Sequence, residues 1–413
     1  MSLHIDSNRV WQNLMRLAEF RDAAYPGWTR RPFTTEYQAA RGWLQDLMGS
    51  AGLEVTLDPG ANLVGSHAGS VPAQLVVGSH TDTVIGAGRF DGMLGVIAAI
   101  ECARVLHDAG WPLRHGLQVY DFLAEEPSPY GVSTVGSRAV SGHLPANLLS
   151  LEDSRGETLA DGIRRAGGDP SALGRPLLTG EDVAAYLELH IEQGPYLETH
   201  KLPLGIVTGI VGIRRYRVTI HGSPGHAGAT PMDTRRDALV GASAVVTHVH
   251  QWASEQVGDL VATIGQIEVQ PNALNVIPGT ATLGIEVRAL DGMRLDRFAT
   301  FLENFVHGLG AEHNYEVSVR ETTREDPVLM NAAVRRIMAN VFQEAEWAHV
   351  ELPSWAGHDT VQMAHVTPHC GMIFVPSRGG LSHCPEEWTE PRDAAMGVEA
   401  LLQTILQLDR ELN

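Results

Sequence analysis

Two short segments place metal-binding side chains at the end of a predicted strand and at the start of a predicted helix. The segment Gly78-Ser-His-Thr-Asp-Thr83 follows a short apolar run that favours a buried strand. Asp91 precedes the apolar run 92–100, which is too long for a typical strand and indicates a buried helix. In α/β folds, ligand sites gather where strands end and helices begin. His80 and Asp91 are therefore candidate metal ligands, and Asp82 is placed to accept the other ring N–H of His80.

Two more predicted strands end on residues of the same chemical types. A strand at 117–124 runs into the paired acids Glu125 and Glu126, and a strand at 185–190 ends on His190. Strands of an α/β sheet present such ends at one edge of the sheet, where active sites form. We therefore expect these side chains to meet.

Five side chains could together bind two divalent ions: His80, Asp91, Glu126, His190 and, in a Gly-Gly-Leu-Ser-His segment, His383. Imidazole and carboxylate ligands suit zinc and manganese, and tolerate cobalt and nickel. If Asp91 bridges the ions, both can act on one water and polarise a carbonyl oxygen. Glu125 would then be free to take the proton of that water, because adjacent side chains at a strand end point apart.

Taken singly, each of these residues also has an ordinary structural interpretation. A histidine in a loop is commonly just hydrogen-bonded, an Asp before a helix is commonly an N-cap, and a Glu-Glu pair is commonly solvated. The chain has 19 histidines, so their number decides nothing. The metal-site interpretation rests on the occurrence of these residues together, most of them at strand ends.

The chain is long enough, at 413 residues, for two domains. The strands predicted after residue 212 alternate polar and apolar residues, which suits a sheet with one face in water. We expect an α/β catalytic domain, with a mixed sheet flanked by helices, from 1–212 and 327–413, and an inserted α+β domain at 213–326. The pattern also predicts helices within 1–50 and at 237–255, 295–309 and 394–408, and strands at 53–57, 62–64, 216–220 and 371–375.

Composition excludes several classes of function. The net charge of −19 argues against nucleic acid as a partner, because phosphate binding needs clustered Lys and Arg. The three cysteines show no CxxC spacing, which fits a reducing compartment. The start of the chain has no signal-peptide pattern, and no apolar run is credible as a membrane span. We therefore expect a soluble cytoplasmic protein.

These segments resemble the M20 metallopeptidase superfamily and, within it, the hydantoinase/carbamoylase amidase family. That family includes N-carbamoyl-L-amino acid hydrolases, allantoate amidohydrolases and β-ureidopropionases. General M20 peptidases usually have an acidic residue where His190 stands, so the His-Ile-Glu-Gln-Gly stretch indicates the amidase family. The matching segments are 78–83, 88–92, Glu125-Glu126 with 135–138, 189–194, 225–231, 271–278, 356–359 and 376–383.

The resemblance implies a phosphorylase/hydrolase-like catalytic domain with a lid and dimerisation domain, and a homodimer. It implies that one ion is held by His80, Asp91 and His190 and the other by Asp91, Glu126 and His383, with Glu125 as the general base. By the same resemblance, Gln193 and Gly357 contact substrate from the main domain. His226, Asn275 and Arg288 would do so from the small domain, in the family typically that of the neighbouring subunit. The domain joints near 212 and 326 imply hinge closure around the substrate.

The expected reaction is hydrolysis of a linear C–N bond, most simply the ureido group of an N-carbamoyl-L-amino acid or a related ureido acid. Three departures from the family pattern, at Pro127–Tyr130, Ile213 and Cys384, spare every expected ligand, but the first two could reshape the pocket. An M20-type aminoacylase or dipeptidase acting on N-acyl amino acids or peptides stays open. So does a metal-free binding protein, against which the intact base and ligands argue.

Overall fold

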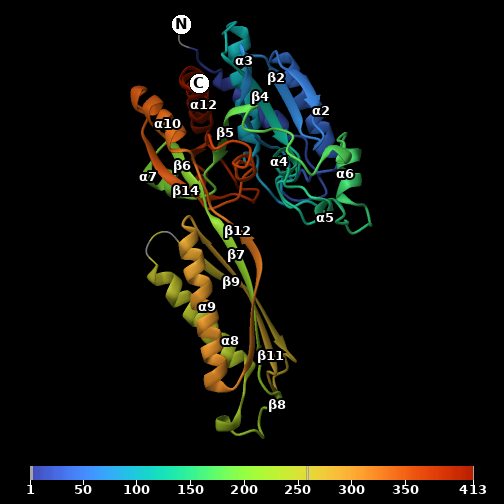
Figure 1. Cartoon of the computed structure of the whole chain (residues 1–413), viewed down its shortest axis with the longest axis vertical. Coiled ribbons are helices and arrows are strands. Elements are labelled where there is room, and N and C mark those ends of the chain that lie inside the picture. Colours follow the sequence, from blue (N-terminus) through green and yellow to red (C-terminus); the bar gives the residue numbers. More distant parts are fainter. Residues whose placement is uncertain (1–2, 257, 259, 413) are drawn as a thin grey trace. The chain divides into compact units, whose positions relative to one another are not determined.

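The computed structural model describes residues 3–256, 258 and 260–412, and the chain divides into two compact units (Figure 1). The first unit comprises residues 1–208 and 330–413, and the second is the inserted segment 209–329. The sequence pattern placed these boundaries at 212/213 and 326/327. The end of strand β6 pairs with the short strand β13, Ile210 opposite Val328, and this pairing brings the flanking residues into the inserted unit.

Among the described residues, a mixed nine-stranded sheet has the order β1-β2-β4-β3-β5-β15-β6-β13, with β14 beside β6. The central strands β4, β3, β5 and β15 are parallel, and the pairs outside them for which registers are given are antiparallel. The strands are β1 Glu54–Leu57, β2 Leu63–His67, β3 Val71–His80, β4 His115–Phe122, β5 Val183–Ile191, β6 Leu204–Ile210, β13 Val328–Leu329, β14 His349–Ser354 and β15 Cys370–Val375.

Helix α3 is apolar on nearly every side, and its residues from Met93 to Ala103 are all buried. It packs between strand β3 and the helices α1 and α12. The helices of this unit are α1 Ser7–Ala18, α2 Thr35–Ser50, α3 Met93–Asp108, α4 Val135–Ser141, α5 Ala146–Leu149, α6 Leu159–Arg165, α7 Tyr196–His200, α10 Ala332–Glu344, α11 Thr360–Met363 and α12 Pro391–Glu411, with 3₁₀ turns at Pro170–Ala172 and Arg378–Gly380.

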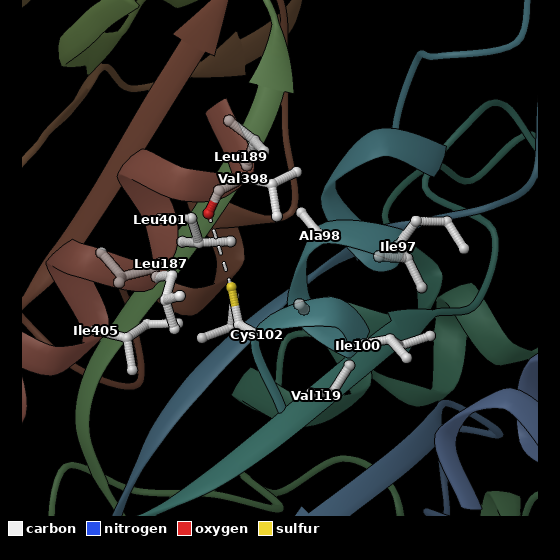
Figure 2. Close-up of a cluster of buried hydrophobic side chains, with 14 of the residues drawn as sticks. Ile97, Ala98, Ile100, Cys102, Val119, Leu187, Leu189, Val398, Leu401 and Ile405 are labelled. Atoms are coloured by element: carbon white, nitrogen blue, oxygen red, sulfur yellow. Dashed lines mark hydrogen bonds between the residues drawn. The ribbon is translucent and has the colours of Figure 1, made fainter. Parts of the chain in front are cut away.

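The main core lies between the sheet and helix α3, and it fixes which way the strand residues point. Figure 2 shows Cys102 of α3 among Leu187 and Leu189 of β5 and Val398 of α12. Because side chains alternate along a strand, His190 lies on the opposite face of the sheet from these leucines.

The second unit has its own four-stranded antiparallel sheet, in the order β12-β7-β11-β9. Alternate residues such as Tyr216 and Val218 pack under two helices, whereas Arg215 and Arg217 are exposed, as the alternating pattern predicts. The elements are β7 Gly212–His221, β9 Leu260–Gln270, β11 Thr280–Ala289, β12 Glu316–Glu325, α8 Ala238–Glu255 and α9 Gly292–His313, with a separate pair β8 Gly225–His226 and β10 Val276–Ile277 and a 3₁₀ turn at Met232–Thr234.

The mixed α/β architecture with flanking helices is confirmed, with one local difference that matters for the site. Strand β4 ends at Phe122, two residues before its predicted end. Ala124 has a φ of 53°, which breaks the extended conformation. Glu125 and Glu126 therefore lie in a turn after the strand. Within the described residues, no helix combines the length and apolar character that crossing a bilayer requires.

Candidate metal centre

His80, the last residue of β3, is held with its Nε2 toward Asp91. Its Nδ1 lies 3.1 Å from the main-chain carbonyl oxygen of Asp82, and its Nε2 lies 3.5 Å from Asp91 Oδ1. The Asp82 carboxylate, which the sequence suggested as the partner, is 3.7 Å from Nδ1. Gly92 has a φ of 68°, and a Cβ there would lie 2.4 Å from His80 Nε2. The imidazole can therefore occupy this place only beside a glycine.

The Asp91 carboxylate lies between two sets of histidines. The N-cap of α3 is Gly92 and receives no side-chain cap, so Asp91 does not cap this helix. Its Oδ1 lies 3.2 Å from His190 Nε2, and its Oδ2 lies 3.2 Å from His383 Nε2. The two oxygens of one carboxylate thus face different imidazoles, which is the arrangement of a bridging ligand.

Two main-chain features orient the remaining histidines. His190 Nδ1 lies 2.9 Å from the carbonyl oxygen of Ile191, which leaves Nε2 toward Asp91; that Nε2 also accepts the amide of Gly92 at 3.1 Å. His383 has a φ of 56°, and its Nε2 lies 3.2 Å from Glu126 Oε1.

The Asp82 carboxylate fixes the turn that carries the paired acids. Its two oxygens accept the main-chain N–H groups of Glu125 and Glu126, each at 3.1 Å. Glu126 then faces His383, while Glu125 Oε2 lies 3.7 Å from His80 Nε2. The turn and its carboxylate clamp separate the two acids, a role that the sequence interpretation gave to strand alternation.

The side chains form two ligand groups that share Asp91: His80, Asp91 and His190, and Asp91, Glu126 and His383. Ligands about 2.1 Å from one tetrahedral ion lie about 3.4 Å from each other. The observed separations of 3.2–3.5 Å between the imidazole nitrogens and the carboxylate oxygens fit that spacing. The residues present therefore fit a divalent cation in each group.

Burial of several carboxylates sets the electrostatics of the centre. It raises the pKa of Glu125 well above its usual value, against the effect of His80 and together with that of Glu126. Burial likewise raises the pKa of Asp82, to about 7. Burial acts in the same direction on Asp91, but the three surrounding histidines hold the pKa of Asp91 well below its usual value. Such a concentration of buried acids favours a bound cation.

A third group, Glu188, His190 and His358, also has metal-ligand spacing. The two oxygens of Glu188 already accept hydrogen bonds from the hydroxyls of Ser79, Tyr186 and Thr360 and from the Thr360 amide. The Nε2 of His190 is directed to Asp91. This third group is better explained as a hydrogen-bonded support behind the two others.

Two further predicted site residues lie in the first unit. Gln193 donates from Nε2 to Asp91 Oδ2 at 2.6 Å, and its buried Oε1 has no hydrogen-bond partner among the described residues. Gly357 is exposed, and no described atom lies within 4 Å of the place a Cβ would take.

The other three predicted site residues lie in the second unit, at two separate places. His226 and Asn275 are brought together by the β8–β10 pair, where the Ala227 amide donates to the Asn275 carbonyl. His226 Nδ1 accepts the amides of Gly228 and Ala229. Arg288 lies on β11 opposite Ile213, and its Nε donates to Glu286 at 2.8 Å.

In the segment Pro127–Tyr130, which departs from the family pattern, the tyrosine has a structural role. Tyr130 is 4% exposed, packs edge-on against Phe33 and donates its hydroxyl to Glu157 at 2.9 Å. Pro127 and Pro129 are exposed. The tyrosine is therefore part of a satellite core, and only the prolines face outward.

Comparison with known proteins decides the family. Residues 63–407 match the model of peptidase family M20/M25/M40. An N-carbamoyl-L-amino acid amidohydrolase of Geobacillus stearothermophilus is 37% identical over 98% of this chain and 99% of its own length. An allantoate amidohydrolase of Escherichia coli is 34% identical, with 97% of both chains covered.

The chain belongs to the M20 family. A solved hydantoinase/carbamoylase family amidase from Burkholderia multivorans superposes with a TM-score of 0.91 at 33% identity, covering the whole of both chains. The chain is thus an M20-type hydrolase of C–N bonds, in a metal-dependent family and with candidate ligands in place.

Sequence patterns missed several residues that build this M20 centre. Gly92 and the buried acids Glu188 and Glu387 act through contacts that are not local in sequence. The carbonyl of Ile191 acts on the neighbouring His190, but no sequence pattern indicates a carbonyl's direction. The Gly that follows Asp91 was the one available signal, because a glycine beside a predicted ligand indicates a close approach of another group.

The shared position of Asp91 predicts unequal effects of removing ligands. Asp91→Ala should lose both ions, because both groups lose a ligand, whereas His383→Ala should lose only the ion of its own group. Metal content after dialysis, measured by plasma mass spectrometry, tests this, with the exposed His143→Ala as control. Full metal content in Asp91→Ala would contradict the shared ligand.

Proposed function

We propose that this chain is a two-metal amidohydrolase that cleaves the ureido C–N bond of an N-carbamoyl-L-amino acid or a related ureido acid. The observation that carries the proposal is the Asp91 carboxylate, whose two oxygens face separate ligand groups, with Glu125 beside one of them. The names of the relatives support the ureido group as the target.

The ligands would be divided as the resemblance implies: His80, Asp91 and His190 for one ion, and Asp91, Glu126 and His383 for the other. Zinc or manganese suits this set, and cobalt or nickel is compatible with it. When bound, the two ions would supply Lewis acidity and a lowered pKa for the attacking water.

Glu125 is the proposed general base. Its buried carboxylate takes a proton as water adds to the ureido carbonyl, and it returns that proton to the nitrogen that leaves. The bond from the carbonyl carbon to the terminal nitrogen breaks and releases ammonia and a carbamate. The carbamate then loses carbon dioxide, with its proton passing to nitrogen, and leaves the free amino acid.

Substrate contacts follow from the chemistry of the remaining residues. The Oε1 of Gln193, which lacks a partner among the described residues, can accept a substrate N–H. Gly357 leaves open space, and the guanidinium of Arg288 suits an α-carboxylate. Asn275 can bond to polar groups of the substrate, and His226 can stabilise an oxyanion.

We also propose that the protein is cytoplasmic and that it forms a homodimer through the second unit. The strand β9 is an edge of its sheet and exposes Val261 and Ile267. Unpaired edges with exposed apolar residues favour association between chains.

Ammonia release tests the reaction directly. Manganese- or zinc-loaded protein should release ammonia from an N-carbamoyl-L-amino acid, allantoate or β-ureidopropionate, and a chelator should abolish the release. A carboxamide analogue of the best substrate should be turned over poorly, because it offers Arg288 no carboxylate. Cleavage confined to N-acetyl amino acids or dipeptides would reject the ureido reaction and assign an aminoacylase or dipeptidase.

Glu125→Gln separates chemistry from metal binding. The variant should keep both ions but lose about 10²–10⁴-fold in kcat, the usual contribution of a general acid–base group. Metal content and steady-state kinetics measure the two effects, and exposed Glu54→Gln on β1 serves as the matched control. Substantial remaining turnover in Glu125→Gln would remove this residue from the mechanism.

A further inference from the structure

Glu387 is a fully buried carboxylate that binds the main chain beside Asp91. Its Oε1 accepts the N–H of Phe90 at 2.8 Å and that of Asp91 at 3.2 Å. It lies so close to the main chain of Gly88 that a Cβ there would come within 2.2 Å of the Glu387 side chain. The start of the Asp91 turn is thus held by a residue almost 300 positions away in the sequence.

Ser382 continues this contact to the side chains of the centre. Its Oγ lies 3.0 Å from Glu387 Oε2 and 2.7 Å from Asp91 Oδ2. Ser382 also directly precedes His383, whose Nε2 lies 3.2 Å from the same Asp91 oxygen. The Glu387 carboxylate therefore contacts the main chain of Asp91 directly. Through the Ser382 hydroxyl it is also linked to the Asp91 carboxylate and to the segment that carries His383.

The loop between β15 and α12 is also held by contacts that do not involve the Glu387 carboxylate. The Arg378 amide donates to the Trp388 carbonyl, and the Thr389 hydroxyl donates to the Pro376 carbonyl. The Trp388 ring packs edge-on against Phe90. These contacts are independent of the Glu387 carboxylate, so its removal should disturb the nearby ligands more than the path of the loop.

We propose that Glu387 is a positioning residue that, through Ser382, holds Asp91 and His383 in the geometry of the ligand group they share with Glu126. This inference rests on the two-metal centre of the proposed function. A glutamine at 387 can keep both amide contacts through its oxygen. The Ser382 hydroxyl donates to Glu387, and a glutamine NH₂ can replace that contact with one of reversed direction, donating to Ser382 Oγ. An alanine removes all of them.

The chain offers a matched control in Asp409 on α12. This buried carboxylate also accepts two consecutive main-chain amides from a distant segment, those of Arg114 at 3.0 Å and His115 at 2.7 Å. It holds the start of β4 and contacts no metal ligand in the described residues. Asp409→Ala should therefore lower the stability of the fold, because buried amides lose their acceptor, while leaving metal binding intact.

The test is titration of the metal-free proteins with Mn²⁺ alone, followed by electron paramagnetic resonance, with thermal unfolding in parallel. Wild type should bind two ions with a spin-coupled signal. Glu387→Ala should keep the ion of the His80 group and bind the second about 10–100-fold more weakly, as outer partners of metal ligands usually require. Glu387→Gln should bind both ions nearly as tightly as wild type, because it keeps the outer contacts.

Three outcomes would overturn the inference. Unchanged affinity for both ions in Glu387→Ala would leave this residue with a structural role only. Equal weakening in Asp409→Ala would attribute the effect to general destabilisation, and equal weakening in Glu387→Gln would attribute it to charge. If Glu387→Ala does not fold, Glu387→Asp decides, because the shorter side chain keeps the charge but cannot reach both the two amides and Ser382. It should still weaken the second ion, and unchanged affinity there would overturn the inference. Fewer than two ions in wild type would instead reject the two-metal centre itself.

Discussion

The buried carboxylate of Asp91 lies among three imidazole nitrogens, and the rest of the centre depends on satisfying its charge. Removing a carboxylate from water is costly unless cations or hydrogen-bond donors surround it. Here the Gln193 amide and the Ser382 hydroxyl donate to its Oδ2. His80, His190 and His383, from β3, β5 and the loop before α12, lie at 3.2–3.5 Å with nitrogens that can bind a cation. The parallel strands β3 and β5 end on the same edge of the sheet, and helix α3 begins there. The fold thus brings imidazole and carboxylate side chains to one place, and the excess of acids around Asp91 favours divalent cations.

The precision of this arrangement comes from the main chain rather than from the ligands alone. Carbonyl oxygens of Asp82 and Ile191 orient two imidazoles, and the Asp82 carboxylate holds the amides of the turn that carries Glu125. Gly92 leaves room for the His80 ring. These main-chain contacts explain how two neighbouring acids can have different roles. The turn directs Glu126 to His383 and leaves Glu125 near His80.

The spacing of apolar residues predicted much of the fold from sequence, because a long amphipathic or apolar segment favours one type of secondary structure. The helix predicted at 237–255 is α8, Ala238–Glu255, and the strand predicted at 371–375 is β15, Cys370–Val375. Candidate ligands could be named because chemistry-bearing side chains followed such segments. The residues that support the ligands could not be named, because local patterns do not determine which distant segments meet. Glu387, for example, contacts Asp91 from almost 300 residues away. Tyr130 shows the same limit: as a departure from the family pattern it suggested a changed pocket, but its ring is buried against Phe33.

Anomalous X-ray diffraction from crystals of manganese-loaded protein, recorded on both sides of the manganese absorption edge, would locate the ions relative to Asp91. We expect two manganese peaks, each within coordination distance of a different Asp91 oxygen. One peak should lie with His80 and His190 and the other with Glu126 and His383. A single peak, or a peak beside Glu188 and His358, would rule out Asp91 as the ligand shared by two ions.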